Sequence, residues 1–216
     1  MSERSASEAL RRFNPDLVAL VPDVHIDAII RTLVSRLWPH ISFISVKEKG
    51  DPDVFYRAEE WLRPFIHRAQ YALVILDFQW ARPSGLEASH HVREKLKDRL
   101  SRSGWQDRCE VVVIDPEVES WLWADARTLA RAILQEHENE ILRLLPRGSS
   151  KPRNPKEELD RVIEQVNRDR RVRAKRDARL YEQFAREIPK ERLDQCADPA
   201  FSALRWALSS WFGPWR

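Results

Sequence analysis

The sequence predicts an α/β protein whose sheet is mainly parallel. From residue 17 onward, short apolar runs alternate with longer segments of helical period, the pattern of repeated βαβ units. The chain has 216 residues, of which 43% are hydrophobic, enough for one large core. No apolar run approaches the roughly 20 residues that cross a bilayer. We therefore expect no membrane partner.

Four apolar runs carry the strand prediction. Each is rich in β-branched residues and bounded by polar or turn-forming residues, as buried strands are. The predicted strands span 17–21, 41–47, 72–78 and 109–115. Because helical segments separate them, consecutive strands are expected to run parallel.

Three helices are predicted between these strands, at about 25–38, 54–69 and 87–102, because their apolar residues recur on one face. We expect them to cover both faces of the sheet. The residues expected to face inward are Ile26, Ile29, Ile30, Leu33, Val34 and Leu37 in the first helix, Val54, Trp61, Leu62 and Phe65 in the second, and Val92, Leu96 and Leu100 in the third.

The chain is expected to divide into an α/β domain over 1–150 and a helical region over 151–216. Pro, Gly and Ser concentrate at 145–159, which indicates a linker. Near the end, Asp198 and Pro199 fit an N-cap and a first helical position. The apolar stripe that follows is expected to dock this last helix on the first domain. The stripe comprises Phe201, Leu204, Leu208, Trp211 and Phe212.

The positive charge of the chain belongs to its C-terminal region. Residues 151–216 carry 16 basic and 11 acidic groups, and seven of the basic groups lie within 167–179. Basic side chains gain affinity for phosphates by releasing counterions, so this segment is a candidate for contact with DNA or RNA. A solvated helix face, paired in part with upstream acids, is the alternative. The candidate contacts are Arg168, Arg170, Arg171, Arg173, Lys175 and Arg176.

Carboxylates follow three of the four predicted strands. Asp23 follows the first, Asp77 ends the third, and Asp115, Glu117 and Glu119 follow the fourth. In parallel sheets, ligands bind beyond the carboxyl ends of the strands. A structural interpretation also fits, with Asp115 as a helix N-cap and Glu117 complementing the helix dipole.

Carboxylates gathered at one edge raise each other's pKa unless a cation neutralises them. Oxygen ligands without a nearby Cys/His set favour Mg²⁺ or Mn²⁺ over zinc. We expect Asp77, Asp115 and Glu117 to hold the ion, and Asp23 or Glu119 to activate a water molecule or complete the coordination shell.

Other site chemistries lack their sequence signals. Cys109 and Cys196 are far apart and have no ligand spacing, so neither a disulfide nor a zinc site is expected. Gly-rich nucleotide-binding loops are absent from the sequence. The first twenty residues are charged and have no apolar h-region, so we expect a cytoplasmic protein without a signal peptide.

Several segments carry a resemblance to a known family. The most specific is "DPEVESWLWAD" at 115–125. With the acids at the strand ends, it resembles a small bacterial TOPRIM-like family of antiphage defence loci, including proteins of methylation-associated defence systems. That resemblance implies a divalent-metal site and partners among other defence proteins. The remaining segments are "LVPD" (20–23), "GDPDVFYRAEEWLRPF" (50–65), "ALVILDF" (72–78), "SGWQDRCEVVVI" (103–114), "KPRNPKEEL" (151–159) and "CADPAFSALRWALSSWF" (196–212).

Two positions depart from the TOPRIM pattern. Asp23 stands where the family has a glutamate, and Gln79 stands where it has a second acid after the third strand. Fewer anions weaken a Mg²⁺ site. Two hypotheses therefore stay open, a metal-dependent nuclease or phosphodiester-processing protein of a prokaryotic antiviral defence system, and an inactive relative that serves as an adaptor or assembly subunit.

Overall fold

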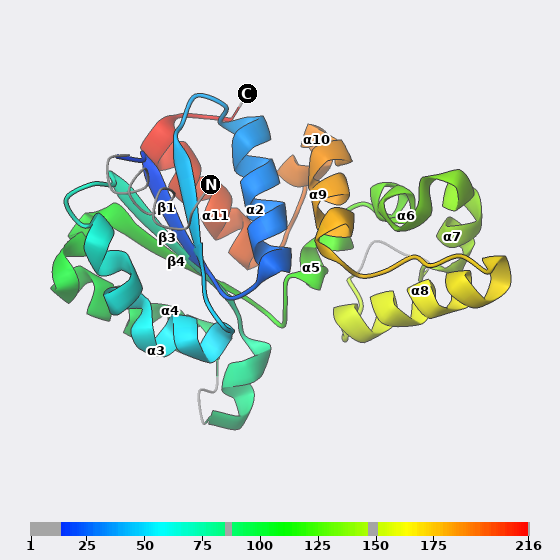
Figure 1. The fold of residues 1–216 in the computed structure, drawn as a ribbon, viewed down its shortest axis with the longest axis horizontal. Coiled ribbons are helices and arrows are strands. Elements are labelled where there is room, and N and C mark those ends of the chain that lie inside the picture. Colours follow the sequence, from blue (N-terminus) through cyan, green and yellow to red (C-terminus); the bar gives the residue numbers. More distant parts are fainter. Residues whose placement is uncertain (1–13, 85–87, 147–150, 216) are drawn as a thin grey trace, which may run out of the picture.

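A parallel sheet forms the centre of the molecule. The computed structural model describes residues 14–84, 88–146 and 151–215, except for the side chains of residues 82–84 and 170. Its four strands are ordered β2-β1-β3-β4, with every neighbouring pair parallel (Figure 1). They are β1 (Leu17–Val21), β2 (Phe43–Lys47), β3 (Tyr71–Asp77) and β4 (Cys109–Ile114). The predicted fold class is confirmed, and each strand boundary lies within two residues of its predicted position.

Helices cover both faces of the sheet. Leu17 and Ala19 face a core formed with α2 (Val24–Leu37) and α11 (Pro199–Phe212). Val18 and Leu20 face the opposite core, formed with α3 (Asp51–Leu62) and α4 (Ser89–Leu100). This alternation follows from the period of two along a strand. The molecule thus has three layers, with β1, β3 and β4 buried between helices and the edge strand β2 partly exposed.

The predicted inward faces of the helices are largely confirmed. All six apolar residues predicted for α2 are buried, as are the three predicted for α4. Helix α3 begins at Asp51, earlier than predicted, with Pro52 in its first turn. It ends at Leu62, before a 3₁₀ turn that contains Pro64, because proline cannot donate the next helical hydrogen bond.

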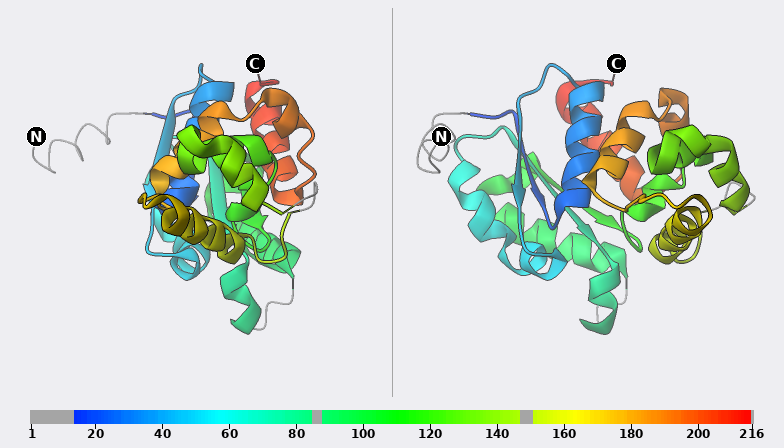
Figure 2. Two further views of the ribbon diagram at one scale, coloured as in Figure 1. Left: turned by 90° about the vertical axis from the view of Figure 1, so that its right-hand side faces the viewer. Right: turned by 45° about the vertical axis from the view of Figure 1, so that its right-hand side comes forward.

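The helices between β4 and α11 extend the molecule to one side. Figures 1 and 2 show α6, α7 and α8 as a group beyond α9, away from the sheet. Helix α9 packs along α2, and α11 packs against β4. These helices are α5 (Glu119–Leu122), α6 (Ala126–Leu134), α7 (Glu138–Leu144), α8 (Pro155–Arg170), α9 (Ala178–Glu187) and α10 (Lys190–Asp194). Shorter helical turns span 63–65, 79–84, 101–105, 106–108 and 135–137.

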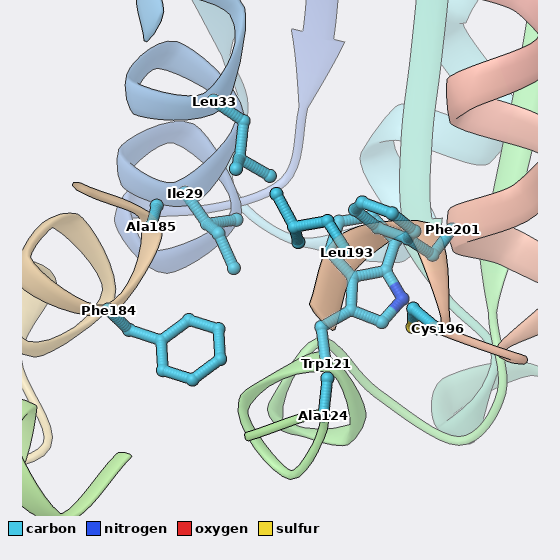
Figure 3. A pocket seen from close by; sticks show the side chains of 9 residues that line it. All are labelled: Ile29, Leu33, Trp121, Ala124, Phe184, Ala185, Leu193, Cys196 and Phe201. Carbon is cyan, nitrogen blue, oxygen red and sulfur yellow. The ribbon is translucent and has the colours of Figure 1, made fainter. Parts of the chain in front are cut away.

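An apolar centre joins α2 to these C-terminal helices. In Figure 3, Ile29 and Leu33 of α2 lie opposite Trp121 of α5 and Phe201 of α11 around a small void. Asp198 caps α11 by accepting from the backbone N–H groups of Ala200 and Phe201, as predicted. The predicted docking of this last helix on the sheet is also confirmed.

The helical region expected over 151–216 is interrupted within the basic segment. Helix α8 ends at Arg170, Arg171 takes a left-handed conformation (φ 54°), and residues 171–177 are not helical. The Asn167 side chain explains this path, because it donates to the Ala174 carbonyl at 2.9 Å and accepts from the Ala174 N–H at 2.7 Å. Val172 and Ala174 pack against the core. We call residues 171–177 the basic connection.

Candidate functional site

Carboxylates gather at the carboxyl ends of the strands. β1 and β3 are neighbours, but the helices that follow them, α2 and α4, cover opposite faces. A crevice at such a switch point is the usual ligand site of an open parallel sheet. We call the acids there the acidic edge; they are Asp23, Asp51, Asp77, Glu117 and Glu119.

Asp77 is the centre of the acidic edge. Burial raises its pKa well above the usual range, and the charges of the other four acids raise it further. Its Oδ1 atom is buried and has no hydrogen-bond partner. A buried carboxylate oxygen without a partner is costly, so Asp77 is a group that a bound cation would stabilise.

Asp51 lies directly beside Asp77. Its Oδ1 atom accepts a hydrogen bond from the Asp77 backbone N–H at 2.7 Å. Burial raises the pKa of Asp51 to about 6, and the charge of Asp23 contributes. Asp51 was not among the residues predicted from the sequence. The signal was available in "GDPD" at 50–53, because these residues follow β2 and begin α3 at the same edge of the sheet.

Asp23 serves the fold as the N-cap of α2. Its Oδ1 atom accepts from the backbone N–H groups of His25 and Ile26, at 2.8 and 2.9 Å. These two hydrogen bonds fix the carboxyl group at the end of β1, beside Asp51 and Asp77. Its role in the shell of an ion stays a prediction, and the capping bonds already use one of its two oxygens.

Glu117 and Glu119 are buried, with exposed fractions of 4% and 3%. Glu117 accepts from the Lys156 N–H at the start of α8, at 3.0 Å, and burial and the charge of Glu119 raise its pKa. The Oε1 atom of Glu119 accepts from Arg176 Nη1 at 2.9 Å and from the Tyr181 hydroxyl at 2.6 Å. Glu119 is therefore fixed by an ion pair.

Asp115 occupies a different environment. It is exposed, and its backbone carbonyl accepts from Lys151 Nζ at 2.7 Å. The predicted N-cap role is wrong, because α5 begins at Glu119 with Val118 in the cap position. Among the three predicted metal ligands, Asp77 and Glu117 thus lie in the acidic edge, whereas Asp115 lies on the exposed loop before it.

The chemistry of the acidic edge fits a hard divalent cation. The unpartnered oxygen of Asp77 and the mutual repulsion around it are features that Mg²⁺ or Mn²⁺ would neutralise. Within residues 14–84, 88–146 and 151–215, no three His, Cys, Asp or Glu side chains are arranged in ligand geometry. The described part of the chain therefore holds no preformed set of three such ligands at this edge.

The predicted nucleic-acid residues divide into two sets. Arg168, Arg171, Arg173 and Lys175 are exposed, and none forms an ion pair within the described part of the chain. Arg176 points inward to Glu119 and to Asp160, whose Oδ1 atom lies 2.8 Å from its Nε. The side chain of Arg170 lies outside the described residues. Arg176 is therefore an anchor of the basic connection.

Comparison with known proteins adds no family to this description. No protein-family model matches the chain, and neither the curated proteins nor the solved structures contain a match. Among the described residues, every helix is too short or too polar to span a bilayer.

Proposed function

We propose that the acidic edge binds Mg²⁺ or Mn²⁺ and processes phosphodiesters of DNA or RNA, as a TOPRIM-like component of prokaryotic antiviral defence. One observation carries the metal proposal. Asp77 ends β3 with a buried, unpartnered oxygen, and four other carboxylates raise its pKa. The defence setting depends on the sequence resemblance alone.

In this proposal the residues have separate roles. Asp51 and Asp77 hold the ion, and Asp23 and Glu117 complete its surroundings. A bound divalent cation would stabilise the charge that develops on a phosphate during cleavage. Glu119 is a positioning residue, because its pairing with Arg176 ties the start of α5 to the basic connection.

The basic connection supplies a surface for the phosphate backbone. Arg171, Arg173 and Lys175 alternate with inward residues and are exposed. Because the residues between them pack against the core, these three cations face outward on the same connection. Arg176, the next residue, contacts the acidic edge through Glu119. A DNA or RNA strand bound along the basic connection would lead toward the proposed metal site.

The adaptor hypothesis has its own support. An arginine already neutralises Glu119, and Gln79 is exposed and uncharged after β3. Trp206, with an exposed fraction of 65%, offers an apolar contact for another protein. In this version the acidic edge is part of a scaffold and turns over no substrate.

Thermal unfolding with and without Mg²⁺ or Mn²⁺ distinguishes the two hypotheses, because a ligand of the folded state raises its midpoint. The metal proposal requires a rise at millimolar metal that Asp77→Asn abolishes and Asp107→Asn, an exposed control, retains. A plasmid-nicking assay with the same three proteins tests the activity. A flat melting response together with no nicking supports the adaptor.

A further inference from the structure

A second cavity is lined in part by Lys151, whose Nζ donates to the Asp115 carbonyl. It has a volume of about 470 Å³ and lies between α5, α10 and the start of α11. Ser120, Trp123 and Ala124 form one wall, and Lys151 and Arg192 approach from others. Pockets of about 300–1,000 Å³ accommodate small organic ligands. Ala124 and Cys196 also line the enclosed void of Figure 3, so they separate it from this cavity.

Two buried donors in the cavity wall have no acceptor. Ser120 has an exposed fraction of 4%, and its Oγ atom has no hydrogen-bond partner. The Nε1 atom of Trp123 is likewise buried and unpartnered. An indole N–H can only donate, and a hydroxyl donates readily. Unpaired buried donors are rare, and both belong to residues of the cavity wall, so a ligand oxygen that reached them would satisfy them.

The two cationic side chains of the cavity, Arg192 and Lys151, also have N–H groups that remain free to donate. Arg192 is paired only loosely, since its Nε lies 3.5 Å from an Asp125 carboxylate that already caps α6 through Thr128. Its side chain is 56% exposed. Lys151 donates to the Asp115 carbonyl and to Asp198 Oδ2, at 2.7 and 3.0 Å, which leaves one of its three protons.

The acid in the cavity wall is already neutralised. Asp198 accepts from Lys151, from the Trp121 indole and from two backbone N–H groups at the start of α11. Four donors offset its charge, and two of them are N–H groups of the α11 N-terminus. The remaining free groups of the wall are therefore mainly donors, and an incoming anion would meet little repulsion.

We propose that this cavity binds a small organic anion, specifically a nucleoside monophosphate. Its phosphate would accept from Arg192 and Lys151, since a guanidinium matches phosphate geometry. Its flat base would lie against Trp123 and Ala124. The site shares no residue with the acidic edge, so this proposal can be tested independently of the proposed metal function. Its link to that edge is the Lys151 bond to the Asp115 carbonyl.

Isothermal titration of the full chain with AMP, in EDTA to exclude divalent metal, tests the proposal. We expect saturable binding that Arg192→Gln weakens about tenfold or more, because it removes charge-assisted hydrogen bonds. Arg186→Gln, an exposed arginine on α9, is the matched control and should bind as the parent does. Ser120→Ala should also weaken binding while retaining the fold.

Inorganic phosphate and adenosine are the two comparison ligands. Each should bind more weakly than AMP, because each lacks one half of the recognised group. The proposal is overturned if AMP does not bind at millimolar concentration, or if phosphate alone binds as tightly. Equal affinity in the parent, Arg192→Gln and Ser120→Ala would overturn it as well.

Discussion

Arg176, which is partly buried, and the buried Glu119 form an ion pair, with Nη1 2.9 Å from Oε1, although 57 positions separate them in the chain. The Tyr181 hydroxyl donates to the same oxygen at 2.6 Å, and burial raises the pKa of that hydroxyl so that it remains protonated. The pair joins the end of the sheet to the basic connection and to α9. It is therefore a structural link between the acidic edge and the surface proposed to bind nucleic acid.

Removing Arg176 should be strongly destabilising. Arg176→Gln leaves the Glu119 carboxylate buried without its counter-charge, and breaking such a pair costs about 3–5 kcal/mol. Urea denaturation monitored by tryptophan fluorescence measures the loss. Arg173→Gln, three residues away and exposed, should change the free energy of unfolding by less than about 0.5 kcal/mol. Similar stability of the two variants would contradict the structural role assigned to Arg176.

The sheet and its covering helices were predictable because their signals are local. Apolar runs identify the strands, and the apolar face of α2 appears in any window of its sequence. Asp198 was likewise predictable as an N-cap, since capping involves residues two or three positions away. Such features depend on neighbours in the chain and need no knowledge of the tertiary structure.

The composition of the acidic edge was only partly predictable. Strand order brings Asp23 and Asp77 together, and a parallel sheet implies that much. Asp51 joins them because β2 lies at the sheet edge beside β1, so the start of α3 returns to the same end. The pairing of Glu119 with Arg176 depends on the path of residues 171–177, which the Asn167 side chain redirects. No periodic pattern encodes these tertiary contacts.

Replacing Asp77 should stabilise the metal-free protein. Asp77→Asn removes the repulsion between the Asp77 carboxylate and four other carboxylates. It also removes a buried carboxylate oxygen that has no hydrogen-bond partner. We expect a gain of about 1–2 kcal/mol in EDTA at pH 7, equivalent to a rise in Tm of roughly 2–8 °C. Differential scanning calorimetry measures it. Glu119→Gln should shift Tm the opposite way, because it breaks the pair with Arg176; a lower Tm for both variants would refute this account of Asp77.

The raised pKa of Asp51 predicts a specific dependence of stability on pH. Its folded-state pKa is about 6, against an ordinary 3.8, so the folded state binds a proton more tightly than the unfolded state does. The contribution of Asp51 to the free energy of unfolding is therefore fully present below pH 4. It is lost as the pH rises through 6, and the total loss is up to about 3 kcal/mol.

Subtracting the stability profile of Asp51→Asn isolates this contribution, because carboxylates such as Glu110, whose pKa is lowered, act in the opposite direction. Between pH 4 and pH 7, the free energy of unfolding of the parent should fall relative to that of Asp51→Asn. Asp107→Asn, an exposed acid, should give a profile parallel to that of the parent. Parallel profiles for Asp51→Asn as well would mean that Asp51 titrates normally.

The exposed cations of the basic connection should govern the salt dependence of nucleic-acid binding. Replacing Arg171, Arg173 and Lys175 with Gln removes three phosphate contacts, which should reduce the slope of log K against log salt by about 2 for single-stranded DNA. Fluorescence anisotropy between 50 and 200 mM salt, in EDTA, measures the slope. Arg63, Lys95 and Arg186, exposed on other elements, provide a triple Gln control with the same change in charge. Because Val172, Ala174 and Arg176 hold the connection in place and are unchanged, the fold should persist. If the control lowers the slope as much as the test variant does, the attraction arises from net charge alone and the basic connection has no special role.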